Sequence, residues 1–196
     1  MDTFAGEDTL ILTDPVMGDD GEVYPIYTEA LRNRFCELVR RSYVITPNLT
    51  EALILLYGKE KMEAIWREFQ EISGRERLDQ IEEIGRRLAE EFSLSAVVIT
   101  GVDYREGEEL VKIGNLVLEK EKSSWVFAEK SGGSYSGTGD LFASVLSAGL
   151  VKGYSMKKCA HLAVDFISAS IRDAVEEGTD RNDGVCFEAH LGRLIQ

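Results

Sequence analysis

The sequence predicts an α/β fold in which helices pack on a mostly parallel central sheet. Apolar candidate strands alternate with amphipathic helical segments along the 196 residues. These strands are almost continuously apolar, as is typical of strands buried on both faces. Polar and glycine-containing segments follow the strand ends, where open α/β sheets bind ligands. The length and the 44% of hydrophobic residues indicate a single domain over residues 1–196.

Three short apolar runs predict the parallel strands. They are residues 9–13 (TLILT), 42–46 (SYVIT) and 95–100 (SAVVIT). Gly101 is expected to end the third strand. Residues 111–129 instead alternate polar and apolar side chains, which predicts a small antiparallel insertion of two strands around a Lys-Ser turn.

Helical spacing of apolar residues predicts the intervening helices. Residues 28–41 form one with Thr28 as its N-cap, and Thr50 is the expected N-cap of the next helix. Residues 59–92 predict two charged amphipathic helices broken at a Ser-Gly pair. The inward stripe of the second comprises Ile81, Ile84, Leu88 and Phe92. The remaining helices are expected over 141–152 and 156–177, followed by a short extended piece and a last helix.

Composition narrows the function classes. The chain has 22 basic and 35 acidic residues, a net charge of −13, which argues against a surface that binds nucleic acid. Its three cysteines are widely spaced in apolar contexts, as expected for reduced thiols, and its two histidines lack zinc-ligand spacing. No leader pattern or membrane-spanning run is recognisable, so we expect a cytoplasmic protein that does not bind membranes.

The glycine-rich segment before residue 141 is the most informative one. Gly137, Thr138 and Gly139 precede Asp140 at the expected start of a helix, where free backbone N–H groups and the helix dipole favour an anion. A carboxylate beside a phosphate is unfavourable unless it serves the other reactant, as a general base for a substrate hydroxyl. The alternative that Asp140 is only a first-turn acid in a flexible loop stays open.

Oxygen-bearing side chains follow two neighbouring predicted strands. Hard oxygen ligands at adjacent strand ends suit Mg²⁺, which takes one or two carboxylates together with water and phosphate oxygens. Each residue alone could equally be a turn former or a helix start. The residues are Asp14 and Asp19 after the first strand, and Thr46, Asn48, Thr50 and Glu51 after the second.

Five motifs together resemble the pyridoxal kinase branch of the ribokinase-like superfamily. They are DPVMGDDGEVY, ITPNLTEA, VVITG, SGTGDLFAS and GVCFE, in an order that covers essentially the whole chain. The resemblance implies a ribokinase-like three-layer α/β/α fold. It also implies ATP-dependent phosphorylation of the hydroxymethyl group of a B6 vitamer, in salvage of pyridoxal 5′-phosphate, by what is commonly a homodimer.

The resemblance also assigns roles to residues. Asp140 would be the catalytic base. Magnesium would be held by Asp19 and Glu51, directly or through water, and a monovalent cation, K⁺ or Na⁺, would lie among Asp14, Thr46 and Thr100. Residues 125–128 would border the adenine pocket. The residues expected to contact the nucleotide or its cations are Asp14, Thr46, Asn48, Glu51, Thr100, Phe127, Gly137, Thr138 and Gly139.

The chain departs from the family in one respect. Members usually carry a substantial segment before the DPVMGD motif that supplies early strands of the sheet, whereas here that motif begins at Asp14. The sheet is therefore expected to lack its N-terminal strands and to expose an apolar edge. We expect instability or self-association unless something covers this edge.

Other functions remain open. Hydroxymethylpyrimidine (phosphate) kinases look similar through DPVM and TPN..EA, but they typically have cysteine in place of Asp140 and a Lys-Gly-Gly string in place of ITGV. A non-catalytic nucleotide-binding remnant would explain the short N-terminal part, although a pure binder has no need of Asp140. An α/β scaffold without a ligand is the minimal alternative.

Overall fold

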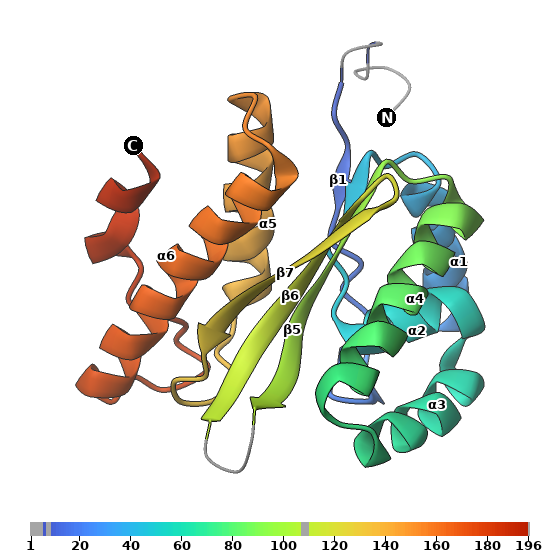
Figure 1. Ribbon diagram of the computed structural model, residues 1–196, viewed down its shortest axis with the longest axis horizontal. Helices are drawn as coiled ribbons and strands as arrows, with labels where there is room; N and C mark the ends of the chain where they lie inside the picture. The colour runs from blue at the N-terminus through green and yellow to red at the C-terminus, as the bar shows by residue number, and fades with distance from the viewer. Residues whose placement is uncertain (1–5, 7–8, 107–109, 196) are drawn as a thin grey trace.

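The computed structural model describes residue 6 and residues 9–106 and 110–195, and it forms a five-stranded sheet between two layers of helices (Figure 1). The strand order is β1-β4-β5-β6-β7. The two pairings among β1, β4 and β5 are parallel, whereas β5–β6 and β6–β7 are antiparallel. The sheet is thus mixed, and the prediction of a mostly parallel sheet is wrong. The strands are β1 Leu12–Thr13, β4 Val44–Ile45, β5 Ala96–Glu106, β6 Leu110–Glu119 and β7 Lys122–Glu129.

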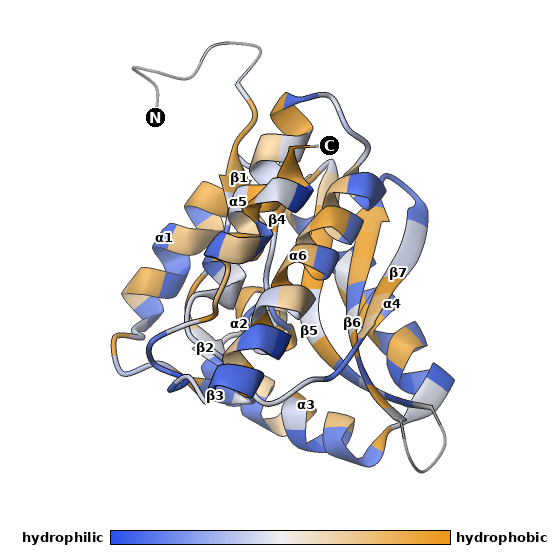
Figure 2. Cartoon of the chain, turned by 90° about the vertical axis from the view of Figure 1, so that its left-hand side faces the viewer, coloured by the Kyte–Doolittle hydropathy of each residue, from blue (hydrophilic) through white to orange (hydrophobic). Residues whose placement is uncertain are grey.

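Helices cover both faces of the sheet. One layer contains α1 Glu29–Val39, α2 Leu49–Tyr57, α3 Lys59–Glu71 and α4 Gly74–Phe92. The other contains α5 Thr138–Val151, α6 Met156–Glu177 and the 3-10 helix η1 Glu188–Leu194. Each layer has its own apolar core against the sheet, and the predicted stripe on α4 is buried in the first of these cores. Figure 2 shows α5 mostly in hydrophobic colours.

A small hairpin lies outside the main sheet. The segment after β1 forms β2 Gly18–Asp19 and β3 Glu22–Val23, which pair antiparallel. The turn between them holds Asp20 and Gly21 at φ 48° and 80°. At Gly21 a Cβ atom would lie 2.3 Å from Nε1 of Trp66, so only glycine allows α3 to pack this closely. The sequence indicates possible turn formers here, but it did not predict the antiparallel pairing of β2 with β3.

The helix starts test the predicted caps. Thr28 is the N-cap of α1, as predicted, and its hydroxyl accepts a hydrogen bond from Leu31 N at 3.0 Å. The prediction for α2 is wrong, because Asn48 rather than Thr50 is the N-cap. In α5 the first helical residue is Thr138, earlier than the predicted residue 141. Each described helix is too short or too polar to cross a membrane.

The extended segments differ from prediction in two places. β5 does not end at Gly101 but passes through a bulge between Ile99 and Val102 and continues to Glu106, with Gly101 at φ 70°. The predicted antiparallel pair at 111–129 is confirmed, although its turn falls at Lys120 and Glu121. The predicted last helix is of the 3-10 type.

Candidate functional site

The carboxyl ends of the parallel strands bring several predicted residues together. Asp14 follows β1 and Thr46 follows β4, and the Thr46 hydroxyl donates to Asp14 Oδ1 at 2.9 Å. The parallel pairing continues beyond β4, where Asn48 forms a bridge with Thr100 and the Thr100 N–H donates to the Pro47 carbonyl at 2.9 Å. These residues therefore occupy neighbouring positions along one end of the sheet.

Glu51 is held at the start of α2 by a capping box. Its N–H donates to Asn48 Oδ1, and its Oε2 accepts from the Asn48 N–H, both at 2.9 Å. The other oxygen, Oε1, accepts from the Met17 N–H at 3.0 Å. The Glu51 side chain is buried, and both of its carboxylate oxygens accept backbone N–H groups.

Two further hydrogen bonds tie the hairpin to the same helix start. Asn48 Nδ2 donates to the Gly18 carbonyl and the Gly21 N–H donates to Thr50 Oγ1, both at 2.8 Å. Thr50 therefore acts across the fold rather than as a cap. Asp19 extends from this anchored hairpin and is exposed.

The surroundings of Glu51 and Asp14 disfavour the charged form of their carboxyl groups. Burial raises the pKa of Glu51 to about 8, which the N–H groups of Asn48 and Met17 oppose and the charge of Asp14 increases. Burial also raises the pKa of Asp14, opposed by the Thr46 hydroxyl and increased by the charge of Asp140. A bound cation would stabilise these carboxylates. Among the described residues no three acidic, His or Cys side chains are arranged to hold a metal, so a cation here would need water or phosphate oxygens as further ligands.

The start of α5 offers unpaired backbone donors. Gly137 is the N-cap at φ 81° and makes no side-chain capping bond. The first helical bond runs from the Leu141 N–H to the Gly137 carbonyl, so the N–H groups of residues 138–140 precede the helical ladder. The Thr138 hydroxyl donates back to the Tyr135 carbonyl at 3.1 Å. Asp140 lies in the first turn and is exposed, so it is available to a ligand.

The glycine-rich segment and the strand ends meet at Gly139. A Cβ atom on Gly139 would lie 3.7 Å from Asp14 Oδ2, and the charge of Asp140 raises the pKa of Asp14. The backbone N–H groups at this helix start and the oxygen-bearing side chains at the strand ends are thus adjacent. This arrangement can bind a phosphate between backbone donors and a cation, beside the carboxylate of Asp140.

Phe127 is not brought to this site. It stacks on Trp125, with ring centroids 5.7 Å apart, and contacts Tyr104 at 5.3 Å. Trp125 packs in the core on the side of α1–α4, and Phe127 alternates onto that same face of β7. The α5 helix covers the opposite face, so Phe127 lies on the face of the sheet that α5 does not cover. Its expected place at an adenine pocket stays a prediction.

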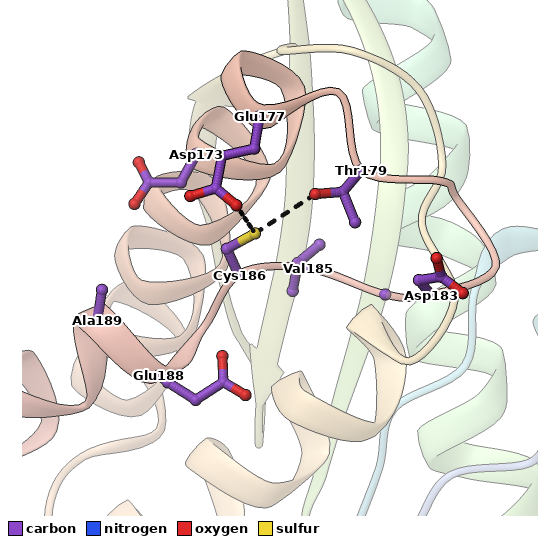
Figure 3. Close-up of a pocket in the computed structure, with 9 residues that line it drawn as sticks. Asp173, Glu177, Thr179, Asp183, Val185, Cys186, Glu188 and Ala189 are labelled. Carbon is purple, nitrogen blue, oxygen red and sulfur yellow. Dashed lines mark hydrogen bonds between the residues drawn. The ribbon is translucent and has the colours of Figure 1, made fainter.

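A pocket of about 360 Å³ lies beside the C-terminal end of α6 (Figure 3). At its centre the Cys186 Sγ lies 3.3 Å from Glu177 Oε2 and 3.6 Å from Thr179 Oγ1. Carboxylates would repel a phosphate, so this pocket is unsuited to a nucleotide's phosphate chain. The acidic residues in its wall are Asp173, Glu177, Asp183 and Glu188.

Two residues near the site carry no clear signal in the sequence. Tyr24 has a raised pKa, chiefly from burial and then from the charges of Asp19, Glu51 and Asp14, which places it on the acidic side of the site. Its presence in the DPVMGDDGEVY string was the one indication. Arg181 contacts the glycine-rich segment from a part of the chain distant in sequence, and no local pattern predicts that contact.

Known proteins resemble this chain over most of its length. Residues 3–184 match the family described as phosphomethylpyrimidine kinase. Among curated proteins, the pyridoxine kinase of Bacillus subtilis (strain 168) is 28% identical over 170 residues, which is 84% of this chain and 54% of the relative.

Solved structures extend the likeness to the fold. A Bacteroides thetaiotaomicron protein described as a candidate phosphomethylpyrimidine kinase matches with a TM-score of 0.83 at 28% identity, over 100% of this chain and 62% of its own. An orthorhombic form of that protein contains pyridoxal. Leishmania donovani pyridoxal kinase, solved with ADP and pyridoxamine, matches in fold with a TM-score of 0.71 at 21% identity, over 97% of this chain and 60% of its own. The chain therefore spans less than two thirds of the length of these relatives.

Proposed function

Because the chain belongs to the phosphomethylpyrimidine kinase family, which matches residues 3–184, we propose that it acts in the ATP-dependent phosphorylation of the hydroxymethyl group of a B6 vitamer. The acceptor would be pyridoxal, pyridoxamine or pyridoxine. The family agrees with the resemblance found in the five sequence motifs.

One observation carries the proposal. The start of α5 lies against the strand ends, with the Gly139 Cβ position 3.7 Å from Asp14 Oδ2. Phosphoryl transfer needs donors for the transferring group, a cation for its charge and a base for the attacking alcohol. The backbone N–H groups at the start of α5, the oxygen-bearing side chains of Asp14 and Thr46, and Asp140 in the first turn of α5 support these three roles.

The proposed step is an in-line displacement at the γ-phosphorus of ATP. The vitamer hydroxyl oxygen forms a bond to phosphorus while the bond from phosphorus to the bridging oxygen of ADP breaks. Asp140 accepts the hydroxyl proton, and the N–H groups of residues 138–140 stabilise the equatorial oxygens. When bound, Mg²⁺ neutralises charge on the phosphate chain.

The cation ligands are also proposals. Asp19 is exposed on the hairpin and is suited to contact Mg²⁺. Glu51 would hold it directly or through water, since each of its oxygens accepts one N–H group and keeps a further lone pair. Asp14 and Thr46 follow β1 and β4, and Thr100 lies at the bulge of β5, where it bridges to Asn48; this supports the three residues as the surroundings of a monovalent cation, K⁺ or Na⁺.

Two observations favour a B6 vitamer over hydroxymethylpyrimidine. Asp140 stands where the pyrimidine kinases typically carry cysteine, and the curated relative is named as a pyridoxine kinase. The family is named for the pyrimidine activity, so hydroxymethylpyrimidine kinase is the second candidate. Retention of an exposed Asp140 argues against a binding-only remnant.

A substrate panel tests the proposal. The purified chain is incubated with MgATP and, separately, pyridoxal, pyridoxamine, pyridoxine and hydroxymethylpyrimidine, and the phosphorylated product is measured by mass spectrometry. We expect phosphate on a B6 vitamer. Preference for hydroxymethylpyrimidine would select the second candidate, and ATP binding without any phosphorylated product would indicate the binding-only remnant.

A further inference from the structure

The four glycines of residues 131–140 are present for different reasons. Gly132 and Gly137 adopt φ values of 64° and 81°, which favour glycine. Gly139 lies in the first turn of α5, facing Asp14. Gly133 has no positive φ, so its backbone conformation does not require glycine.

Arg181 accounts for Gly133. A Cβ atom on Gly133 would lie 2.2 Å from Nη2, 2.5 Å from Cζ and 3.0 Å from Nη1 of Arg181. The whole guanidinium group therefore occupies the space that any other side chain at position 133 would fill. Gly133 is the residue that lets Arg181 lie against the glycine-rich segment.

The main chain fixes Arg181 relative to the start of α5. The Arg181 carbonyl accepts a hydrogen bond from the Ser136 N–H at 2.9 Å, directly before the N-cap Gly137. On the same side, a Cβ atom on Gly184 would lie 3.4 Å from the Ser136 carbonyl oxygen. The turn after α6 is thus packed on the segment that leads to the proposed phosphate site.

The positive charge of Arg181 is not neutralised by an ion pair within the described part of the chain. The side chain is exposed, and among the described residues it makes no ion pair or side-chain hydrogen bond. Lys130, which directly precedes the glycine-rich segment in sequence, is in contrast paired with both oxygens of Asp103 at 2.8 Å. Asp14 and Asp140 add negative charge where a phosphate chain would bind, in a chain of net charge −13.

We propose that Arg181 is a further substrate-binding residue, whose guanidinium group pairs with the phosphate chain of the bound nucleoside triphosphate. This inference rests on the proposed function and deepens it. A planar guanidinium can donate two parallel hydrogen bonds to phosphate oxygens, and it offsets the charge that the two aspartates impose.

The test compares nucleotides with and without phosphates. Dissociation constants for ATP and adenosine are measured by calorimetry, with Mg²⁺, for the wild-type chain and for Arg181→Ala, Arg181→Lys and Gly133→Ala. We expect Arg181→Ala to weaken ATP binding about tenfold, since it removes a charge-assisted pair. Arg181→Lys recovers part of this loss, and adenosine binding is unchanged in every variant.

Gly133→Ala tests whether the position of the Arg181 guanidinium group matters as well as its charge, because this variant keeps the arginine but displaces the group. We expect it to weaken ATP binding as well. Arg34→Ala is the matched control, since Arg34 is exposed on α1 in the opposite helical layer, and it should bind ATP as the wild type does. Circular dichroism and thermal melting establish that each variant is folded.

The outcomes separate this proposal from the function on which it rests. If the wild-type chain binds no ATP, the proposed function fails and Arg181 loses its role with it. If the wild type binds ATP and Arg181→Ala binds it equally well, only the role of Arg181 is overturned. An equal loss of ATP and adenosine affinity would place Arg181 on the base and also overturn the phosphate assignment.

Discussion

The two regions that meet at Gly139 use their polar groups in opposite ways. On the acidic side, which comprises residues 14–21 and the start of α2, the buried side chains of α2 are committed to internal bonds: Glu51 accepts two backbone N–H groups and Thr50 accepts another. On the glycine side, which comprises residues 131–140, the helix start has no side-chain cap and Asp140 is exposed.

This difference distinguishes groups that stabilise the fold from groups that are available to bind a ligand. A buried and fully bonded group resists displacement, because breaking its bonds leaves a polar group unpaired. An uncapped helix start in contact with solvent can exchange water for a ligand without losing internal bonds. We therefore expect substitutions of the buried, bonded side chains on the acidic side to act strongly on stability, and those on the glycine side mainly on activity.

The largest expected effect is on the glycine side. Asp140→Asn removes the proposed base and should lower kcat for vitamer phosphorylation about 100-fold or more, while the dissociation constant for ATP changes little. Steady-state kinetics and calorimetry measure the two quantities. Asp165→Asn, an exposed acid on α6, is the control and should leave both unchanged. Near-normal kcat in Asp140→Asn would show that the base is another group.

On the acidic side, Glu51 should make stability depend on pH. Its pKa is about 8 in the folded protein, against an ordinary value of 4.5, so its contribution is complete below pH 4.5 and is lost as the pH rises to about 8. We expect the free energy of unfolding of the wild type, relative to Glu51→Gln, to fall with pH in this window by at most about 1.4 kcal/mol per unit. Urea denaturation at several pH values measures it. Parallel curves for the two proteins would contradict a raised pKa.

The caps of α1 and α2 give a matched pair. Asn48→Ala removes the cap of α2 and the bond to the Gly18 carbonyl, whereas Thr28→Ala removes only a cap. We expect losses of unfolding free energy of about 2 kcal/mol and about 1 kcal/mol, respectively. Equal losses in chemical denaturation would mean that the Asn48 side chain contributes nothing beyond its cap.

The smallest expected effects distinguish two glycines of one segment. Gly137→Ala places a Cβ on a residue at φ 81° and should cost about 1 kcal/mol of stability. Gly139→Ala meets only Asp14 Oδ2 at 3.7 Å, so its melting temperature should stay the same or rise slightly, although ATP binding should weaken through crowding of the anion site. Unchanged ATP affinity in Gly139→Ala would argue against that site.

Local patterns predicted much of this architecture. The cap at Thr28, the buried stripe of α4 and the helix start near Asp140 all follow from residue types within one or two turns. Tertiary contacts decided the rest. The Thr50 hydroxyl bonds Gly21, which lies 29 residues away, and so leaves the capping role to Asn48.

The errors at the sheet have the same origin. Gly101 reads as the end of a strand, yet pairing with β6 carries β5 through a bulge to Glu106. The role of Phe127 at an adenine pocket, which the family resemblance implies, stays a prediction; the strand register, which local patterns do not give, aligns Phe127 with Gly114 and brings its ring against Tyr104. Arg181 reaches Gly133 only in the folded chain.

The bulge in β5 also affects association between molecules. Parallel pairing with β4 stops at Ile45 and the Asn48 bridge, so beyond Thr100 the described part of β5 pairs only with β6. An unpaired strand edge can form a β-sheet with a strand of another molecule. Bulges and charged side chains at the edge disfavour such pairing. The unpaired edge of β5 has both features, since the exposed residues Asp103 and Arg105 follow the bulge. This part of β5 should therefore resist pairing with a second molecule, and replacing Asp103 and Arg105 by uncharged residues should promote aggregation.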